Sequence, residues 1–109
     1  MTVDDAFLLF RAAAASAGFP EVDERVHPEH FGSRVSTLNQ DSTGLRLVWD
    51  GKEQFLRLEV THGPGDSVQW LDLYQASQSR NRLHADQDDF TFADAVEHGL
   101  DLLASSSRD

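Results

Sequence analysis

Two histidines stand at a spacing that metal sites use, in the run HPEH at residues 27–30. A zinc site needs three or four ligands that are themselves held by further hydrogen bonds. A third donor would have to come from His62 or Asp66, which lie in a separate turn. Because Pro28 prevents both imidazoles from being displayed on one regular helix, we interpret them as loop histidines. The sequence therefore predicts no metal site and no cofactor.

A small basic cluster is the second candidate. Arg80 and Arg82 are followed by His84 within a polar segment, residues 75–89. Arginine forks bind carboxylate or phosphate groups, so a pocket between this segment and a sheet would suit a small-ligand-binding or hydrolytic domain. The chain has no nucleophile elbow, phosphate loop, dinucleotide fingerprint or zinc-protease motif. We predict no catalytic residue and keep the ligand pocket as the alternative function.

The third candidate combines aromatic and arginine side chains, the types that are enriched at the centres of protein interfaces. It consists of Arg46, Phe55, Arg57, Trp70 and Tyr74. These residues alternate with leucines, so we expect them on one face of a sheet, the reverse face. Three alternatives stay open: a partner covers them, residues 21–32 or 75–89 fold over them, or they form the second half of a buried core.

Three strands must position this face, at residues 45–50, 53–61 and 68–74, where apolar and polar residues alternate. Turns are expected at residues 50–53, around Gly51, and at residues 62–66, which contain Gly-Pro-Gly. The opposite face of the sheet is the predicted core. It is built from Leu45, Leu47, Leu56, Leu58, Leu71 and Leu73.

The register of the first hairpin follows from the turn. With Gly51 at the first turn position, Leu47 lies opposite Leu56 and Arg46 opposite Arg57. Two arginines facing each other are unfavourable unless a negative group lies between them. Either an internal carboxylate or a partner must supply it.

Two amphipathic helices are predicted outside the strands, at residues 2–17 and from residue 92 to about residue 104. Both begin with a Thr-x-x-Asp pattern that resembles a capping box. Residues 21–32 read as a crossing segment anchored by Val22, Val26 and Phe31, and residues 34–40 as a polar edge strand. We therefore predict an α+β fold: a two-layer sandwich in which an antiparallel meander of three or four strands carries both helices on one face.

Length and charge limit the function. The 109 residues form one predicted domain, residues 1–104, with a disordered tail at residues 105–109. The net charge of −10 repels nucleic acid and anionic membranes, so we predict neither as a partner. The lack of cysteine fits a cytoplasmic protein. We expect a non-enzymatic protein-binding module that holds a protein partner or its own copy, for example as an acidic, immunity-like inhibitor.

Overall fold

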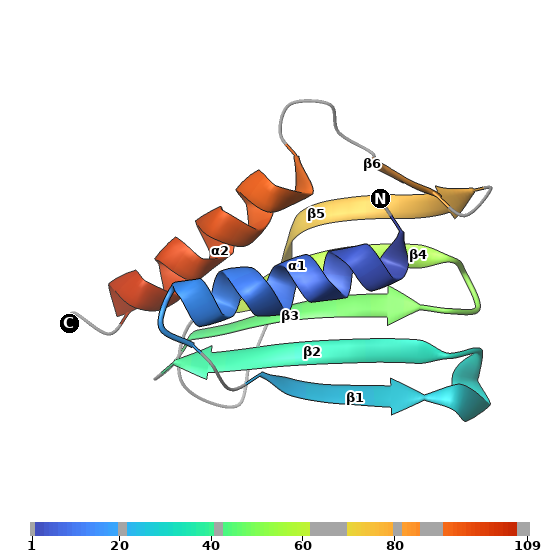
Figure 1. Cartoon of the computed structure of the whole chain (residues 1–109), viewed down its shortest axis with the longest axis horizontal. Helices are drawn as coiled ribbons and strands as arrows, with labels where there is room; N and C mark the ends of the chain where they lie inside the picture. The colour runs from blue at the N-terminus through green and yellow to red at the C-terminus, as the bar shows by residue number, and fades with distance from the viewer. Residues whose placement is uncertain are drawn as a thin grey trace.

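The computed structural model describes residues 2–19, 22–40, 43–61, 70–79, 82–85 and 91–106. In these residues six strands form one antiparallel sheet, and the strands are neighbours in sequence order (Figure 1). Two α-helices, one from each end of the chain, lie against the same face. The elements are α1 (Val3–Ser16), β1 (Asp23–His27), the 3₁₀ turn η1 (Pro28–His30), β2 (Ser33–Gln40), β3 (Thr43–Asp50), β4 (Phe55–Thr61), β5 (Trp70–Ser79), β6 (Arg82–Ala85) and α2 (Phe92–Ser106).

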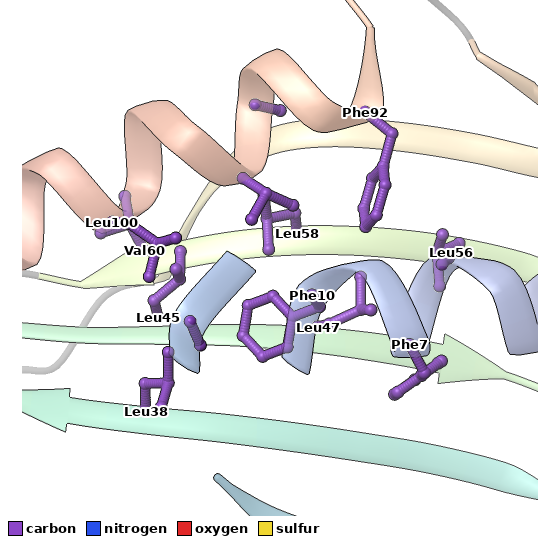
Figure 2. Close-up of a cluster of buried hydrophobic side chains, with 14 of the residues drawn as sticks. Phe7, Phe10, Leu38, Leu45, Leu47, Leu56, Leu58, Val60, Phe92 and Leu100 are labelled. Carbon is purple, nitrogen blue, oxygen red and sulfur yellow. The ribbon is translucent and has the colours of Figure 1, made fainter. Parts of the chain in front are cut away.

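The core lies between the helices and the middle of the sheet (Figure 2). Phe7 and Phe10 of α1 and Phe92 of α2 are buried in one cluster with leucines of β3 and β4. The predicted leucine face is confirmed for the residues of these two strands, which are fully buried: Leu45, Leu47, Leu56 and Leu58. Within the described residues, no helix is long and apolar enough to cross a membrane.

The sheet has six strands, so the prediction of three or four was wrong. β1 lies in the segment read as a crossing, and β6 lies in the polar segment after β5. Both carry little apolar alternation because they are edge strands, held mainly by backbone pairing to one neighbour. Residues 34–40 do form a strand, β2, but it is an interior strand between β1 and β3.

Both helix starts confirm the capping boxes. Thr2 Oγ1 accepts from Asp5 N–H and Asp5 Oδ2 accepts from Thr2 N–H, each at 3.1 Å. The hydrogen bond from Thr2 N–H lowers the pKa of the Asp5 carboxyl, so Asp5 keeps its negative charge to a lower pH than a free aspartate does. Thr91 and Asp94 make the same reciprocal pair for α2. This second helix extends to Ser106, and residues 107–109 lie outside the described residues.

Replacing Thr2 with alanine should lower the free energy of unfolding by about 1 kcal/mol, because Asp5 N–H loses its acceptor. Urea denaturation followed by circular dichroism measures the change. Ser16→Ala, at the other end of α1, is the matched control and should leave stability nearly unchanged. Equal effects of the two variants would contradict a stabilising cap.

The β3–β4 register differs from the prediction by two residues. Leu47 lies opposite Leu58, and Arg46 lies opposite Glu59 rather than Arg57. A shift of two residues keeps every side chain of β3 and β4 on its predicted face, which is why the core positions of these two strands were right although their pairing was wrong. The negative group that the arginines required is therefore supplied inside the fold.

A β-bulge in β5 moves Tyr74 to the face predicted for the leucines. Leu58 pairs with Tyr74 but Glu59 pairs with Asp72, so Leu73 is an extra residue that reverses the alternation. Tyr74 packs against the core, with its ring 5.2 Å from that of Phe92. The placement of Tyr74 on the reverse face was wrong, and so was the core position of Leu71, which is 63% exposed.

Candidate functional site

The reverse face contains an intramolecular cluster around Trp70. The indole reaches from β5 across β4, so that a Cβ on Gly44 of β3 would lie 3.1 Å from the ring. The Arg46 guanidinium stacks on the ring at 3.9 Å and donates to Glu59 Oε1 at 2.9 Å. Glu59 is only 5% exposed. Arg46 and Trp70 thus have partners within the chain, and a binding role for them stays a prediction.

The other two members of the predicted strip that remain on the reverse face lie closer to the β3–β4 turn. Phe55 lies opposite Asp50 and Ser77, and Arg57 lies opposite Val48 and Gln75. Both side chains are half-buried. The strip is therefore divided: its Trp70 end is closed by its own arginine, and its Phe55–Arg57 end adjoins a corner of the sheet.

That corner is formed by the connection between β1 and β2. After η1 the backbone of Phe31 turns into the left-handed region, with φ 59° and ψ 28°, and Gly32 follows at φ 75°. Ser33 Oγ donates to the carbonyl of His30 at 2.7 Å and accepts from Gly51 N–H at 3.0 Å. The corner is thus fastened to the β3–β4 turn, which lies beside it at the same end of the sheet (Figure 1).

Glycine is required at position 51 because a side chain has no room there. A Cβ at this position would lie 2.0 Å from the carbonyl oxygen of Phe31. Gly51 itself is not in left-handed backbone, and the positive φ of this turn belongs to Gln54, at 57°. Asp50 Oδ1 accepts from the N–H groups of Lys52 and Glu53, at 3.0 and 3.1 Å, and so holds a four-residue turn in place of the predicted two-residue loop.

A pocket of about 440 Å³ opens at this corner, and we call it the corner pocket. Its apolar lining comes from Phe31, Val35 and Val48, and its charged lining from Asp50, Lys52 and Arg57. His30, Ser33 and Trp49 complete it. Val35 and Val48 face each other across β2 and β3, and Phe31 stands at the rim with 70% of its surface exposed.

The histidines of the corner surround one carboxylate. Glu29 Oε1 lies 3.5 Å from His27 Nδ1 and 4.0 Å from His30 Nε2. A hydrogen bond from its own backbone N–H, assisted by the histidines, lowers the pKa of Glu29. In the described part of the chain no three histidine or acidic side chains are grouped so that they could hold a metal ion. His62 and Asp66, the predicted third donors, lie outside the described residues.

The basic cluster of the alternative function is only partly described. Arg82 and His84 are exposed on the edge strand β6, with His84 opposite Ser77. Arg80 lies outside the described residues. Neither Arg82 nor His84 lines the corner pocket.

A larger hollow of about 580 Å³ lies between α1 and α2. Its lining is mostly alanine and leucine, with Glu97 and Asp101 as its charged groups. It presents no aromatic side chain and no arginine, the types that anchor interfaces. We therefore take the corner pocket as the candidate site.

The sequence analysis interpreted Phe31, together with Val22 and Val26, as an anchor of a crossing segment. Val22 does pack against the core, but Val26 is 53% exposed and Phe31 more so. The sequence feature that could have predicted this corner is the Phe-Gly pair directly after a turn that begins with proline, since glycine often follows a helical turn that ends in left-handed backbone.

No protein-family model, curated protein or solved structure matches this chain.

Proposed function

We propose that this protein is a non-enzymatic protein-binding module whose partner sits on the reverse face at the corner pocket. The partner is either a different protein or a second copy of the chain. The observation that carries the proposal is the state of Phe31, an aromatic residue in left-handed backbone whose ring is mostly exposed beside an apolar pocket.

Both features of Phe31 cost free energy in the isolated protein. A non-glycine residue in left-handed backbone costs about 1–2 kcal/mol, and an exposed phenyl ring forfeits its hydrophobic burial. Such outliers concentrate at binding and switch regions, where the surrounding structure holds them in place. Here the bonds of Ser33 to His30 and Gly51 hold the corner. A partner that buries the ring would recover the free energy of hydrophobic burial.

The shape of the surface supports protein over small-molecule binding. Arg57 on β4 lines the pocket directly, and the half-buried Phe55 lies two residues before it on the same face of that strand. An aromatic anchor, an adjoining arginine and a polar surround are the parts of a small interface centre. In the inhibitor version of the proposal, the net charge of −10 adds attraction toward a basic partner.

Replacing Phe31 with asparagine tests the proposal. Asparagine tolerates left-handed backbone, so the free energy of unfolding should rise by about 1 kcal/mol. Binding should weaken by more than about tenfold, because a central aromatic anchor is lost. Sedimentation equilibrium measures self-association, and capture from an extract of the source cells measures binding of other proteins.

Leu8→Asn is the matched control, since Leu8 is exposed on α1 in the helix layer and lies outside the corner. It should leave both association and capture unchanged. If Phe31→Asn also leaves both unchanged relative to the unsubstituted protein, the corner pocket is not a binding site and the proposal is wrong.

The small-ligand alternative remains a second candidate because Arg82 and His84 project from neighbouring positions of an edge strand. It predicts that Arg82→Gln abolishes binding of a carboxylate or phosphate compound while Phe31→Asn does not. Ligand screening by thermal shift on these two variants separates the two functions.

A further inference from the structure

The charge pattern of the corner pocket defines its partner more closely. Most described arginines have an acidic partner in the chain. Arg11 and Arg34 bind Glu24, Arg25 lies 3.5 Å from Asp23, and Arg46 binds Glu59. Arg57 is half-buried and makes no ion pair with any residue that the structure describes. Of the other described arginines only Arg82, which is exposed on β6, likewise has none, so Arg57 is the half-buried arginine that lacks an ionic partner among the described residues.

The carboxylates nearest to Arg57 are already engaged. Its direct neighbours across the sheet, Val48 and Gln75, are uncharged. The nearest acidic positions on this face are Asp50 on β3, Glu59 on β4 and Asp72 on β5, and Asp72 accepts from Gln75 Nε2. Asp50 accepts from two N–H groups of the β3–β4 turn, and Glu59 accepts from Arg46. Among the described residues the hydrogen-bond donors of Arg57 have no partner, which leaves them for a group from outside.

The rest of the pocket adds to this positive character. Lys52 lies on the rim and has no ion pair within the described ranges, so the pocket carries two permanent cations against one engaged carboxylate. The apolar floor of Val35 and Val48 lies beside Arg57, since Val48 is directly opposite it. A group that complements this site has an apolar part next to a negative part.

We infer that the corner pocket recognises a segment of a partner polypeptide in which an apolar side chain stands next to an aspartate or glutamate. The apolar side chain packs on Phe31, Val35 and Val48, and the carboxylate pairs with the guanidinium of Arg57. A carboxylate can accept two parallel hydrogen bonds from arginine, which makes Arg57 the specificity-determining residue. The inference rests on the proposed binding function and adds the chemistry of the partner.

Selection from a phage-displayed library of random linear peptides tests this inference. The baits are the unsubstituted protein and the variants Phe31→Asn, Arg57→Gln, Arg57→Lys and Arg11→Gln. Arg11→Gln is the control, because it removes one positive charge from α1 in the helix layer. We expect the unsubstituted protein and Arg11→Gln to enrich the same peptides, with an acidic residue beside an apolar one.

The Arg57 variants supply the decisive comparison. Arg57→Gln should keep the apolar preference, lose the acidic one, and bind the enriched peptides about 10- to 100-fold more weakly in fluorescence anisotropy. Arg57→Lys should retain part of the affinity, since it keeps the charge but not the fork. Replacing the acid of an enriched peptide by its amide should weaken binding to the unsubstituted protein and leave binding to Arg57→Gln unaffected.

The outcomes separate the inference from the proposed function. If every enriched peptide binds Phe31→Asn as well as the unsubstituted protein, or if none is enriched, the corner pocket is not a binding site and both ideas are wrong. If the peptides require Phe31 but show no acidic preference, or bind Arg57→Gln equally well, only the acidic partner is wrong and the binding function stands.

Discussion

Replacing Arg46 with methionine is expected to lower the free energy of unfolding by about 3 kcal/mol. The substitution leaves the carboxylate of Glu59 almost fully buried without its partner. Removing one member of a buried ion pair typically costs about 3–5 kcal/mol. We expect the lower end of this range because the Arg46 side chain is 31% exposed. Methionine keeps an apolar stem against Trp70, so the loss reports the ion pair together with the stacking of the guanidinium on the ring.

The double variant Arg46→Met, Glu59→Met should restore stability to within about 1 kcal/mol of the unsubstituted protein, since two apolar side chains leave no buried charge. Urea denaturation of both single variants and the double variant completes the thermodynamic cycle. Arg25→Met is the exposed control: its pair with Asp23 is 72% and 64% exposed, so it should change stability by less than about 0.5 kcal/mol. A double variant as unstable as Arg46→Met would show that the buried charge is not the cause.

Replacing Gly51 with alanine is the second large effect, with an expected loss of about 3 kcal/mol. The new methyl group would lie 2.0 Å from the carbonyl oxygen of Phe31 and 2.7 Å from its carbon. Both are backbone atoms, so no rotamer change relieves the clash and the β1–β2 corner must move away from the turn. The hydrogen bond from Gly51 N–H to Ser33 Oγ should lengthen with it.

Gly32→Ala shows whether the loss of stability in Gly51→Ala comes from a steric clash or from backbone conformation. Gly32 has a positive φ of 75°, but no atom lies within 4 Å of a Cβ there. Its replacement should cost about 1 kcal/mol from conformation alone. Urea denaturation gives both losses, and hydrogen exchange of the amide at position 51 should accelerate only in Gly51→Ala. Equal losses for the two variants would mean that the corner does not pack on the turn.

The central part of the fold could be predicted from residue alternation. The buried leucines of β3 and β4 recur with period two, at positions 45, 47, 56 and 58. Both helices were predicted by their Thr-x-x-Asp starts and apolar faces. These signals are local. A strand with one buried face shows alternating apolar and polar residues whichever strand it pairs with. The outer strands carried no such signal, since β1 and β6 depend on backbone hydrogen bonds to β2 and β5.

Only the tertiary structure decided the pairing partners and the site. A two-residue shift in the first hairpin preserves every face, so the sequence could not distinguish Arg57 from Glu59 opposite Arg46. One extra residue in β5 moved Tyr74 into the core without a local signature. The corner pocket joins the β1–β2 connection to β3 and β4, where the Phe31 carbonyl lies so close to residue 51 that only glycine leaves it room. Contacts between residues so distant in sequence depend on strand register, which a local pattern of residue types does not encode.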